Sequence, residues 1–127
     1  MTLYQAIVGN APSVHLEPER FQTFAAAQLE AATPWQPGIC FNPSCSAPFV
    51  LEREWQIYCC PACAKQADAE MRKWGHKAAV SLLTWRQFKY ASKGSVEADL
   101  SRAARRHVTQ VQSAWLADRQ RRVENAQ

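Results

Sequence analysis

The stretch from Cys40 to Cys63 reads CFNPSCSAPFVLEREWQIYCCPAC and contains all five cysteines of this 127-residue chain. The first pair is Cys40-x4-Cys45, and Cys59, Cys60 and Cys63 follow after a gap long enough for a hairpin. Two closely spaced pairs can place four thiolates at the corners of a tetrahedron, about 2.3 Å from a zinc ion. The spacing therefore predicts one Zn²⁺ per chain, and metal binding is expected to supply much of the local folding energy.

Two other uses of these cysteines fit the sequence less well. An odd number of cysteines cannot pair completely, and residues 1–9 lack the positively charged start of a secretory signal. No apolar run approaches the length of a membrane segment, so we expect a cytoplasmic protein whose thiols stay reduced. A thioredoxin-like pair Cys60-Pro-Ala-Cys63 would need a larger α/β sheet, and it would leave the upstream cysteines without a purpose.

Charge is divided unequally between the two halves of the chain. Residues 1–59 contain two basic and five acidic side chains, whereas residues 60–127 contain thirteen basic and six acidic ones. Hydrophobic residues make up 47% of the chain, which excludes disorder throughout and predicts a modest helical core beside the metal. The basic half indicates that the C-terminal part meets an anion, most simply nucleic acid.

Helical periodicity dominates outside the cysteine segment. A first helix is predicted from residue 17 to Ala32, because Pro18 suits a first helical position. Another is expected to start at the last cysteine pair and end near Gly75, followed by one over residues 77–91. Ser95 caps a long basic C-terminal helix, which is expected to project in part or to form a homodimer with a second copy. The predicted core stripes are Phe21, Phe24, Ala25 and Leu29 in the first helix, and Leu100, Ala104, Val108, Val111 and Trp115 in the last. Residues 2–8 indicate a short strand or an arm.

Two motifs of the cysteine segment match a known pattern: Cys40-x4-Cys45-x3-Phe49, and Gln56-x-Tyr58-Cys59-Cys60-x-x-Cys63. Together they resemble small bacterial and phage treble-clef zinc fingers, over residues 39–74. The resemblance implies a zinc knuckle, a β-hairpin with strands at 48–51 and 55–58, and a helix. The expected fold is thus mostly α, with a treble-clef finger over residues 39–75 embedded among several helices. An N-terminal arm and helix (1–38) precede the finger, and a helical C-terminal region (76–127) follows it.

The resemblance and the simple spacing assign the third metal ligand differently. The resemblance implies the ligands Cys40, Cys45, Cys59 and Cys63. Simple Cys-x2-Cys spacing assigns Cys60 in place of Cys59. Three positions depart from the family pattern: Cys60 replaces a Ser, Ser46 stands where Gly is common, and Ala64 replaces a frequent basic residue. Four thiolates leave no coordination position for water, so the zinc is expected to be structural.

The remaining candidate residues predict binding and not catalysis. His15, His76 and His107 are scattered, and no Gly-rich phosphate loop is present, so an enzyme is not expected. The leading hypothesis is a zinc-finger transcription regulator, of the kind that phages and mobile elements carry, which binds nucleic acid, DNA in preference to RNA. Its candidate phosphate contacts are Lys65, Arg72, Lys73, Lys77, Arg102, Arg105 and Arg106. The alternative is an adaptor or inhibitor that docks on the transcription machinery or another host complex. Its candidate aromatic anchors are Trp35, Trp55 and Trp115. Ordinary solvated helix faces explain the charges equally well.

Overall fold

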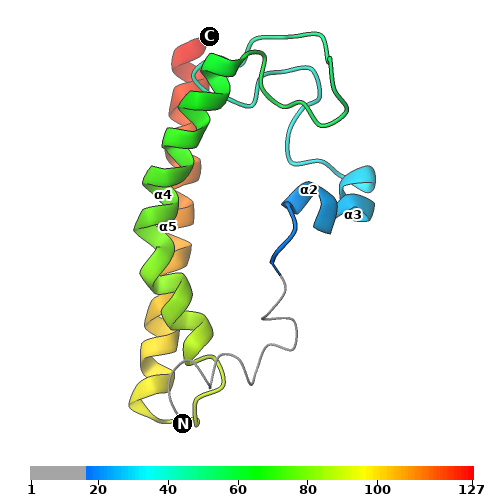
Figure 1. Cartoon of the computed structure of the whole chain (residues 1–127). Coiled ribbons are helices and arrows are strands. Elements are labelled where there is room, and N and C mark those ends of the chain that lie inside the picture. The colour runs from blue at the N-terminus through cyan, green and yellow to red at the C-terminus, as the bar shows by residue number, and fades with distance from the viewer. Residues whose placement is uncertain (1–16) are drawn as a thin grey trace. The chain divides into compact units, whose positions relative to one another are not determined.

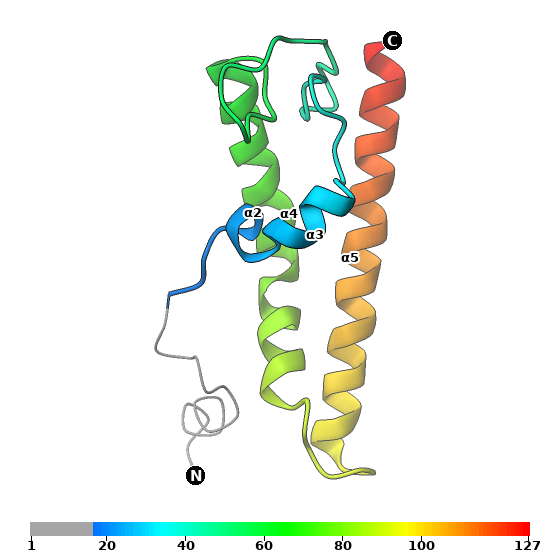
Figure 2. The ribbon, with the colours of Figure 1, turned by 90° about the vertical axis from the view of Figure 1, so that its right-hand side faces the viewer.

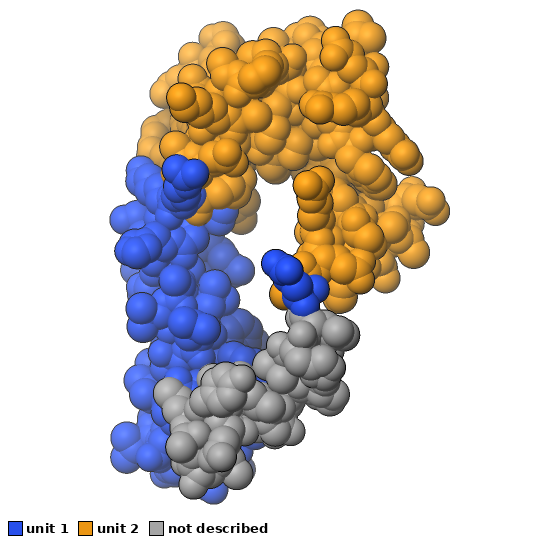
Figure 3. Space-filling model, in the orientation of Figure 1, with its two compact units in different colours: residues 1–17, 72–115 blue, residues 18–71, 116–127 orange. Residues whose placement is uncertain are grey.

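The computed structural model describes residues 17–127, and most of these residues are helical (Figure 1, Figure 2). The helices are α2 (Phe21–Phe24), α3 (Ala26–Ala31), α4 (Pro61–Gln87) and α5 (Val96–Ala126). The chain divides into two compact units, coloured separately in Figure 3: one contains residues 72–115, the other residues 18–71 and 116–127. Helices α4 and α5 therefore each contribute a segment to both units. None of the helices described is long and apolar enough to cross a membrane.

Small side chains line the contact between α4 and α5 within residues 72–115. The buried ones are Ala78 and Ser81 on α4, and Ala98, Ser101, Ala104, Val108 and Val111 on α5. Because these side chains are short, hydrogen bonds can cross between the helices. The Ser101 hydroxyl donates to the Trp85 carbonyl at 3.2 Å, and the Ser81 hydroxyl lies 2.9 Å from Nδ1 of His107. The pairing of 85 with 101 and of 81 with 107 shows that the two segments run antiparallel.

The unit of residues 72–115 buries few large apolar side chains. Trp74 and Trp115 stack with their rings almost parallel and their centroids 6.1 Å apart. By contrast, Val80 and Leu83 on α4 are 75% and 68% exposed, and Leu100, expected in the core stripe of α5, is 47% exposed. Two packed helix segments bury one stripe each, so apolar residues on their other faces stay in contact with water.

The treble-clef prediction is wrong, because its β-hairpin does not form anywhere in residues 17–127. The β-type pairing described there is one isolated antiparallel bridge, between Ile39 and Pro48. Residues 47–49 pair with residues 38–40 and not with 55–58. The Cys40 N–H donates to the Ala47 carbonyl, and the Phe49 N–H donates to the Gly38 carbonyl, both at 2.8 Å. The first cysteine pair thus lies on a closed turn, but no sheet follows it.

The side chain of Gln56 bonds to backbone groups on both sides of its own position. Its Oε1 accepts a hydrogen bond from the Glu52 N–H at 2.8 Å, and its Nε2 donates to the Tyr58 carbonyl at 2.9 Å. The Tyr58 carbonyl belongs to the expected second strand, and this hydrogen bond satisfies it without a partner strand. Pro48 also lacks the N–H that a strand would donate. Residues 50–58 consequently form a series of turns and bends.

The first predicted helix is wrong in its start and in its continuity. Residues 17–20 are not helical, and Ala25, with φ −108° and ψ 28°, separates α2 from α3. Of the predicted core stripe, Ala25 and Leu29 are buried, whereas Phe21 and Phe24 are 60% and 77% exposed. The strand or arm expected at residues 2–8 lies outside the described residues.

Helix α4 continues through Gly75, where the sequence predicted an end, so the two helices expected over residues 61–91 are one. A glycine inside a helix costs about 1 kcal/mol relative to alanine, which the flanking helix formers outweigh. The break falls later, in the loop that contains Gly94 with φ +85°. The predicted cap of the next helix is confirmed, since the Ala98 N–H donates to Oγ of Ser95 at 3.1 Å.

We expect Gly75→Ala and Gly94→Ala to have opposite effects on stability. A Cβ at Gly75 would meet nothing within 4 Å, so alanine there should raise the free energy of unfolding by about 0.5–1 kcal/mol. At Gly94 the positive φ disfavours any side chain, so alanine there should lower the free energy of unfolding by about 1 kcal/mol. Urea denaturation followed by far-UV circular dichroism measures both. Shifts of the same sign would contradict these conformations.

Candidate metal centre

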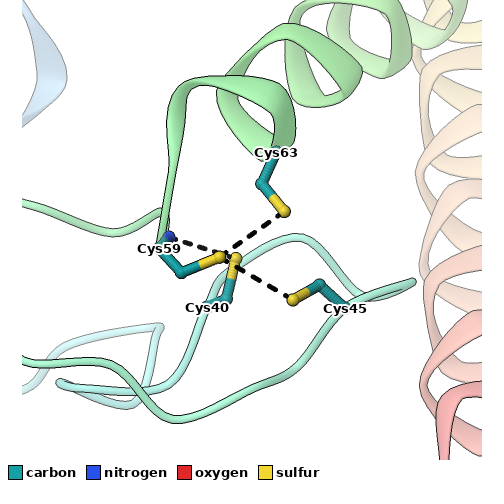
Figure 4. Close-up of side chains that lie close together, drawn as sticks. All are labelled: Cys40, Cys45, Cys59 and Cys63. Atoms are coloured by element: carbon teal, nitrogen blue, oxygen red, sulfur yellow. Dashed lines mark hydrogen bonds between the residues drawn. The ribbon is translucent and has the colours of Figure 1, made fainter.

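Four cysteine sulfurs converge on one point (Figure 4). They belong to Cys40, Cys45, Cys59 and Cys63, and all lie within 4.8 Å of one another. The sulfur of Cys59 is 3.9 Å from that of Cys45 and 3.7 Å from that of Cys63. A tetrahedron with sulfurs about 2.3 Å from its centre has edges of about 3.8 Å, whereas a disulfide bond is about 2.05 Å long. The cluster therefore has the dimensions to hold a metal ion through four thiolates.

Cys60 lies outside this four-sulfur cluster. Its side chain is exposed, and its sulfur is 3.7 Å from that of Cys59. The backbone N–H of Cys63, and then the Cys59 thiol, lower the pKa of Cys60. The same contact with Cys60, followed by partial burial, raises the pKa of Cys59. Of the two alternatives left open by the sequence, the geometry brings Cys59 into the cluster.

A tight turn around Asn42 positions the first cysteine pair. The Asn42 carbonyl accepts hydrogen bonds from the N–H groups of Cys45 and Ser46, both at 2.9 Å. Its side-chain oxygen accepts another from the Ser44 N–H at 3.1 Å, which closes an Asx turn. Ser46 has φ +54°, in the left-handed region that glycine adopts without strain. Ser46 therefore has a backbone conformation that favours glycine.

Backbone N–H groups point at two of the sulfurs. The Cys59 N–H donates to Sγ of Cys40 at 3.4 Å. A hydrogen bond from the backbone of Ala47 lowers the pKa of Cys45. The Ala47 contact favours the thiolate of Cys45, which is the form of cysteine that binds metals.

Two backbone features deliver the second cysteine pair. The Phe41 N–H donates to the Ile57 carbonyl at 2.7 Å, which holds the segment before Cys59 against the turn of residues 40–46, here called the knuckle. Helix α4 then begins at Pro61, a residue suited to a first helical position, so that Cys63 faces the cluster from the first turn.

A buried ion-pair network, which the sequence analysis missed, ties the knuckle to the last turns of α5 within the same unit. Arg119 donates to Oε2 of Glu70 at 2.5 Å and to the Phe41 carbonyl at 2.6 Å. Arg122 contacts Oε1 of Glu70 at 3.0 Å and donates to the Ser44 hydroxyl at 2.8 Å. The Glu70 side chain is 4% exposed, so its charge depends on these two arginines.

Asn42 joins this network from the knuckle side. It is 1% exposed, its Nδ2 donates to Oε1 of Gln66 at 2.7 Å, and its Oδ1 accepts from Arg122 at 3.2 Å. A signal for the arginines was present in the sequence. Arg119 and Arg122 follow Trp115 by four and seven residues, so they continue the stripe that α5 buries. A charge on a buried stripe requires a buried partner.

The predicted phosphate contacts are divided between the two units. Lys65 belongs to the unit with the cysteines, and the other six belong to residues 72–115. All seven side chains are exposed: Lys65, Arg72, Lys73, Lys77, Arg102, Arg105 and Arg106. Lys73 and Lys77 lie 5.4 Å and 6.0 Å from the centre of the Trp74 ring. Arg102 forms an ion pair with Asp99.

The three candidate tryptophan anchors differ in exposure. Trp35 is half-buried and contacts the ring of Trp55 edge-on, with centroids 6.3 Å apart. Trp115 is half-buried against Trp74. Trp55 is 40% exposed, so it presents the most accessible ring of the three.

Comparisons with models of protein families, with curated proteins and with solved structures found no match for this chain. The fold and the site therefore define its class on their own: a helical protein with a four-cysteine cluster that can hold a metal ion. The resemblance to zinc fingers remains a prediction from the sequence motifs.

Proposed function

We propose that the four-cysteine cluster holds one structural Zn²⁺. Four thiolates are a donor set that zinc favours, and the sulfur separations suit its tetrahedral geometry. With all four positions filled by cysteine, no site remains for a substrate or a catalytic water. The metal's contribution is then to fold the knuckle and to fix it to the start of α4.

We further propose that the protein binds nucleic acid, DNA in preference to RNA, and regulates transcription. The observation that carries this proposal is the charge of residues 72–115, which include nine basic and two acidic side chains. The other unit, residues 18–71 and 116–127, holds six basic and eight acidic ones. The positive charge is therefore concentrated on the paired helix segments and not spread over the chain. Such a field attracts a polyanion.

Three arginines of α5 form the centre of the proposed contact surface. Arg102, Arg105 and Arg106 are spaced three and four residues apart, so they share one face of the helix. Together with Thr109 they line a shallow hollow of about 340 Å³. Among the described residues, no carboxylate lies within ion-pair distance of Arg105 or Arg106. Guanidinium groups suit phosphate oxygens, which they can bind in pairs.

The triple variant Arg102→Ala/Arg105→Ala/Arg106→Ala should weaken binding to a 20-base-pair duplex in a salt-dependent way. Each lost phosphate contact lowers the slope of log K against log salt by about 0.9, so the loss should reach up to about 2.7. Fluorescence anisotropy in a salt series measures the slope. Far-UV circular dichroism should not change, because alanine is a good helix former.

A matched control removes the same charge from the other unit, by the change of Arg20, Arg53 and Arg121 to Ala. All three side chains are exposed, so this control should fold and should keep the wild-type salt slope. Equal losses in both triple variants would show that only net charge matters. If the wild-type protein binds neither the duplex nor a single strand at low salt, the nucleic-acid proposal fails.

A second candidate function, a protein-binding adaptor of the transcription machinery, is favoured by the exposed apolar residues. Val80 and Leu83 lie three residues apart on α4, and both are largely exposed. An interface of this kind responds little to salt, whereas phosphate contacts respond steeply. The salt series therefore separates the two functions.

A further inference from the structure

A cavity of about 530 Å³ lies where the end of α4, the following loop and the start of α5 meet. Its wall includes Trp85, Phe88, Lys89, Lys93, Arg102 and Arg105. All of these residues belong to one compact unit. The volume falls within the range of about 300–1,000 Å³ typical of small-ligand sites. None of its lining residues belongs to the cysteine cluster.

The charges around the cavity favour an anion. Four cationic side chains line it, and no carboxylate is among the lining residues. The nearest acidic partner that the structure gives to these cations is Asp99, which pairs with Arg102. Within residues 17–127, Lys89, Lys93 and Arg105 have no carboxylate within ion-pair distance. Their charge remains available to a bound molecule.

The aromatic part of the wall favours a flat ring. Trp85 and Phe88 are half-buried, and both residues line the cavity. The Trp85 carbonyl accepts the hydrogen bond from buried Ser101, which anchors this turn of α4 to α5. The Arg105 guanidinium lies 5.9 Å from the centre of the Trp85 ring. Aromatic rings and guanidinium planes are the groups on which proteins stack unpaired bases.

We propose that this cavity binds one unstacked nucleotide of a single-stranded nucleic acid. The base stacks against the Trp85 and Phe88 wall, and the flanking phosphates contact Lys89, Lys93 and Arg102. This proposal rests on the nucleic-acid binding proposed above and specifies its substrate class. Because the bases of a duplex already stack on one another, the cavity gives single strands an advantage that the phosphate contacts alone do not provide.

The test compares an octathymidylate strand with an abasic strand of the same length and charge. Anisotropy at fixed salt should show that the thymidylate strand binds about tenfold more tightly or better, as expected from stacking one base on an aromatic side chain. Phe88→Leu should abolish most of this difference and leave affinity for the abasic strand unchanged. Tyr90→Leu is the matched control, since Tyr90 is a neighbouring exposed aromatic that does not line the cavity.

A second variant tests the phosphate side without touching the packed rings. Lys89 and Lys93 are exposed and lie in the loop, so changing both to Ala should not disturb folding. The double variant should lower the slope of log K against log salt for the thymidylate strand by about 1.4, because each phosphate contact with a single strand contributes about 0.7.

The outcomes separate this inference from the function on which it rests. Equal affinity for the thymidylate and abasic strands, or equal effects of Phe88→Leu and Tyr90→Leu, would overturn the cavity site and leave nucleic-acid binding in place. Absence of binding to either strand and to the duplex at low salt would overturn both proposals. A base-dependent gain that Phe88→Leu removes and Tyr90→Leu preserves supports the site.

Discussion

Cys59→Ser will abolish metal binding and unfold the cysteine segment, whereas Cys60→Ser will leave both unchanged. The two residues are adjacent and the substitution is the same, but only Cys59 belongs to the four-sulfur cluster. Structural zinc sites contribute an apparent binding free energy of about 10–16 kcal/mol, and that energy is available for folding only when all four ligands are present. This is the largest effect expected from any single substitution in the chain.

Elemental analysis of protein purified without chelator measures this difference. The wild-type protein and Cys60→Ser should each contain one zinc per chain, and Cys59→Ser should contain none. Cys63→Ser should behave like Cys59→Ser, since Cys63 is buried in the same cluster. A wild-type protein without zinc, or with a mass that indicates two disulfides, would refute the metal site. If Cys60→Ser loses zinc and Cys59→Ser retains it, Cys60 and not Cys59 is the third ligand.

Glu70→Ala should lower the free energy of unfolding by about 3–5 kcal/mol. The substitution leaves Arg119 and Arg122, 17% and 23% exposed, without their shared carboxylate. Removing one partner of a buried pair costs this much because the remaining charge stays desolvated. Asp68→Ala, an exposed carboxylate two residues away on α4, is the matched control and should change the free energy by less than about 0.5 kcal/mol.

Urea denaturation of the zinc-loaded protein tests this prediction. Arg119→Ala should be similarly destabilising, because it also leaves the Phe41 carbonyl without its 2.6 Å donor. The double variant Glu70→Ala/Arg119→Ala should cost less than the sum of the single changes. Equal effects of Glu70→Ala and Asp68→Ala would mean that the network does not stabilise the fold.

The spacing of the cysteines predicted that the two pairs meet, because ligand geometry constrains sequence separation, but it left the third ligand open between Cys59 and Cys60, and Cys59 lies in the cluster. The cysteine spacing could not establish the conformation of the segment between the two pairs. The hairpin prediction failed: Pro48 forms its bridge with Ile39, and the Gln56 side chain bonds to the Tyr58 carbonyl of the expected second strand. That choice depends on a side-chain conformation, which periodicity does not report.

Helix boundaries show a similar limit. Gly75 and Gly94 are both plausible ends of a helix in sequence, but only Gly94 adopts a positive φ. The positions of Arg119 and Arg122 on the buried stripe of α5 were readable from their spacing. Their partner Glu70 was not, since it lies 49 residues from Arg119 and pairs with it only in the folded chain.

The contacts of Arg119 and Arg122 with the knuckle also set an order of events during synthesis of the chain. Arg119 is made 78 residues after Phe41, and Arg122 is made 78 residues after Ser44. At about 5–20 residues per second, a ribosome needs about 4–16 s to cover that distance. A metal ion captured early would therefore meet a knuckle whose carbonyl and hydroxyl groups are still bound to water. The contacts of Arg119 and Arg122 can therefore form only after all four cysteines have been synthesised, and they require closure of a long loop.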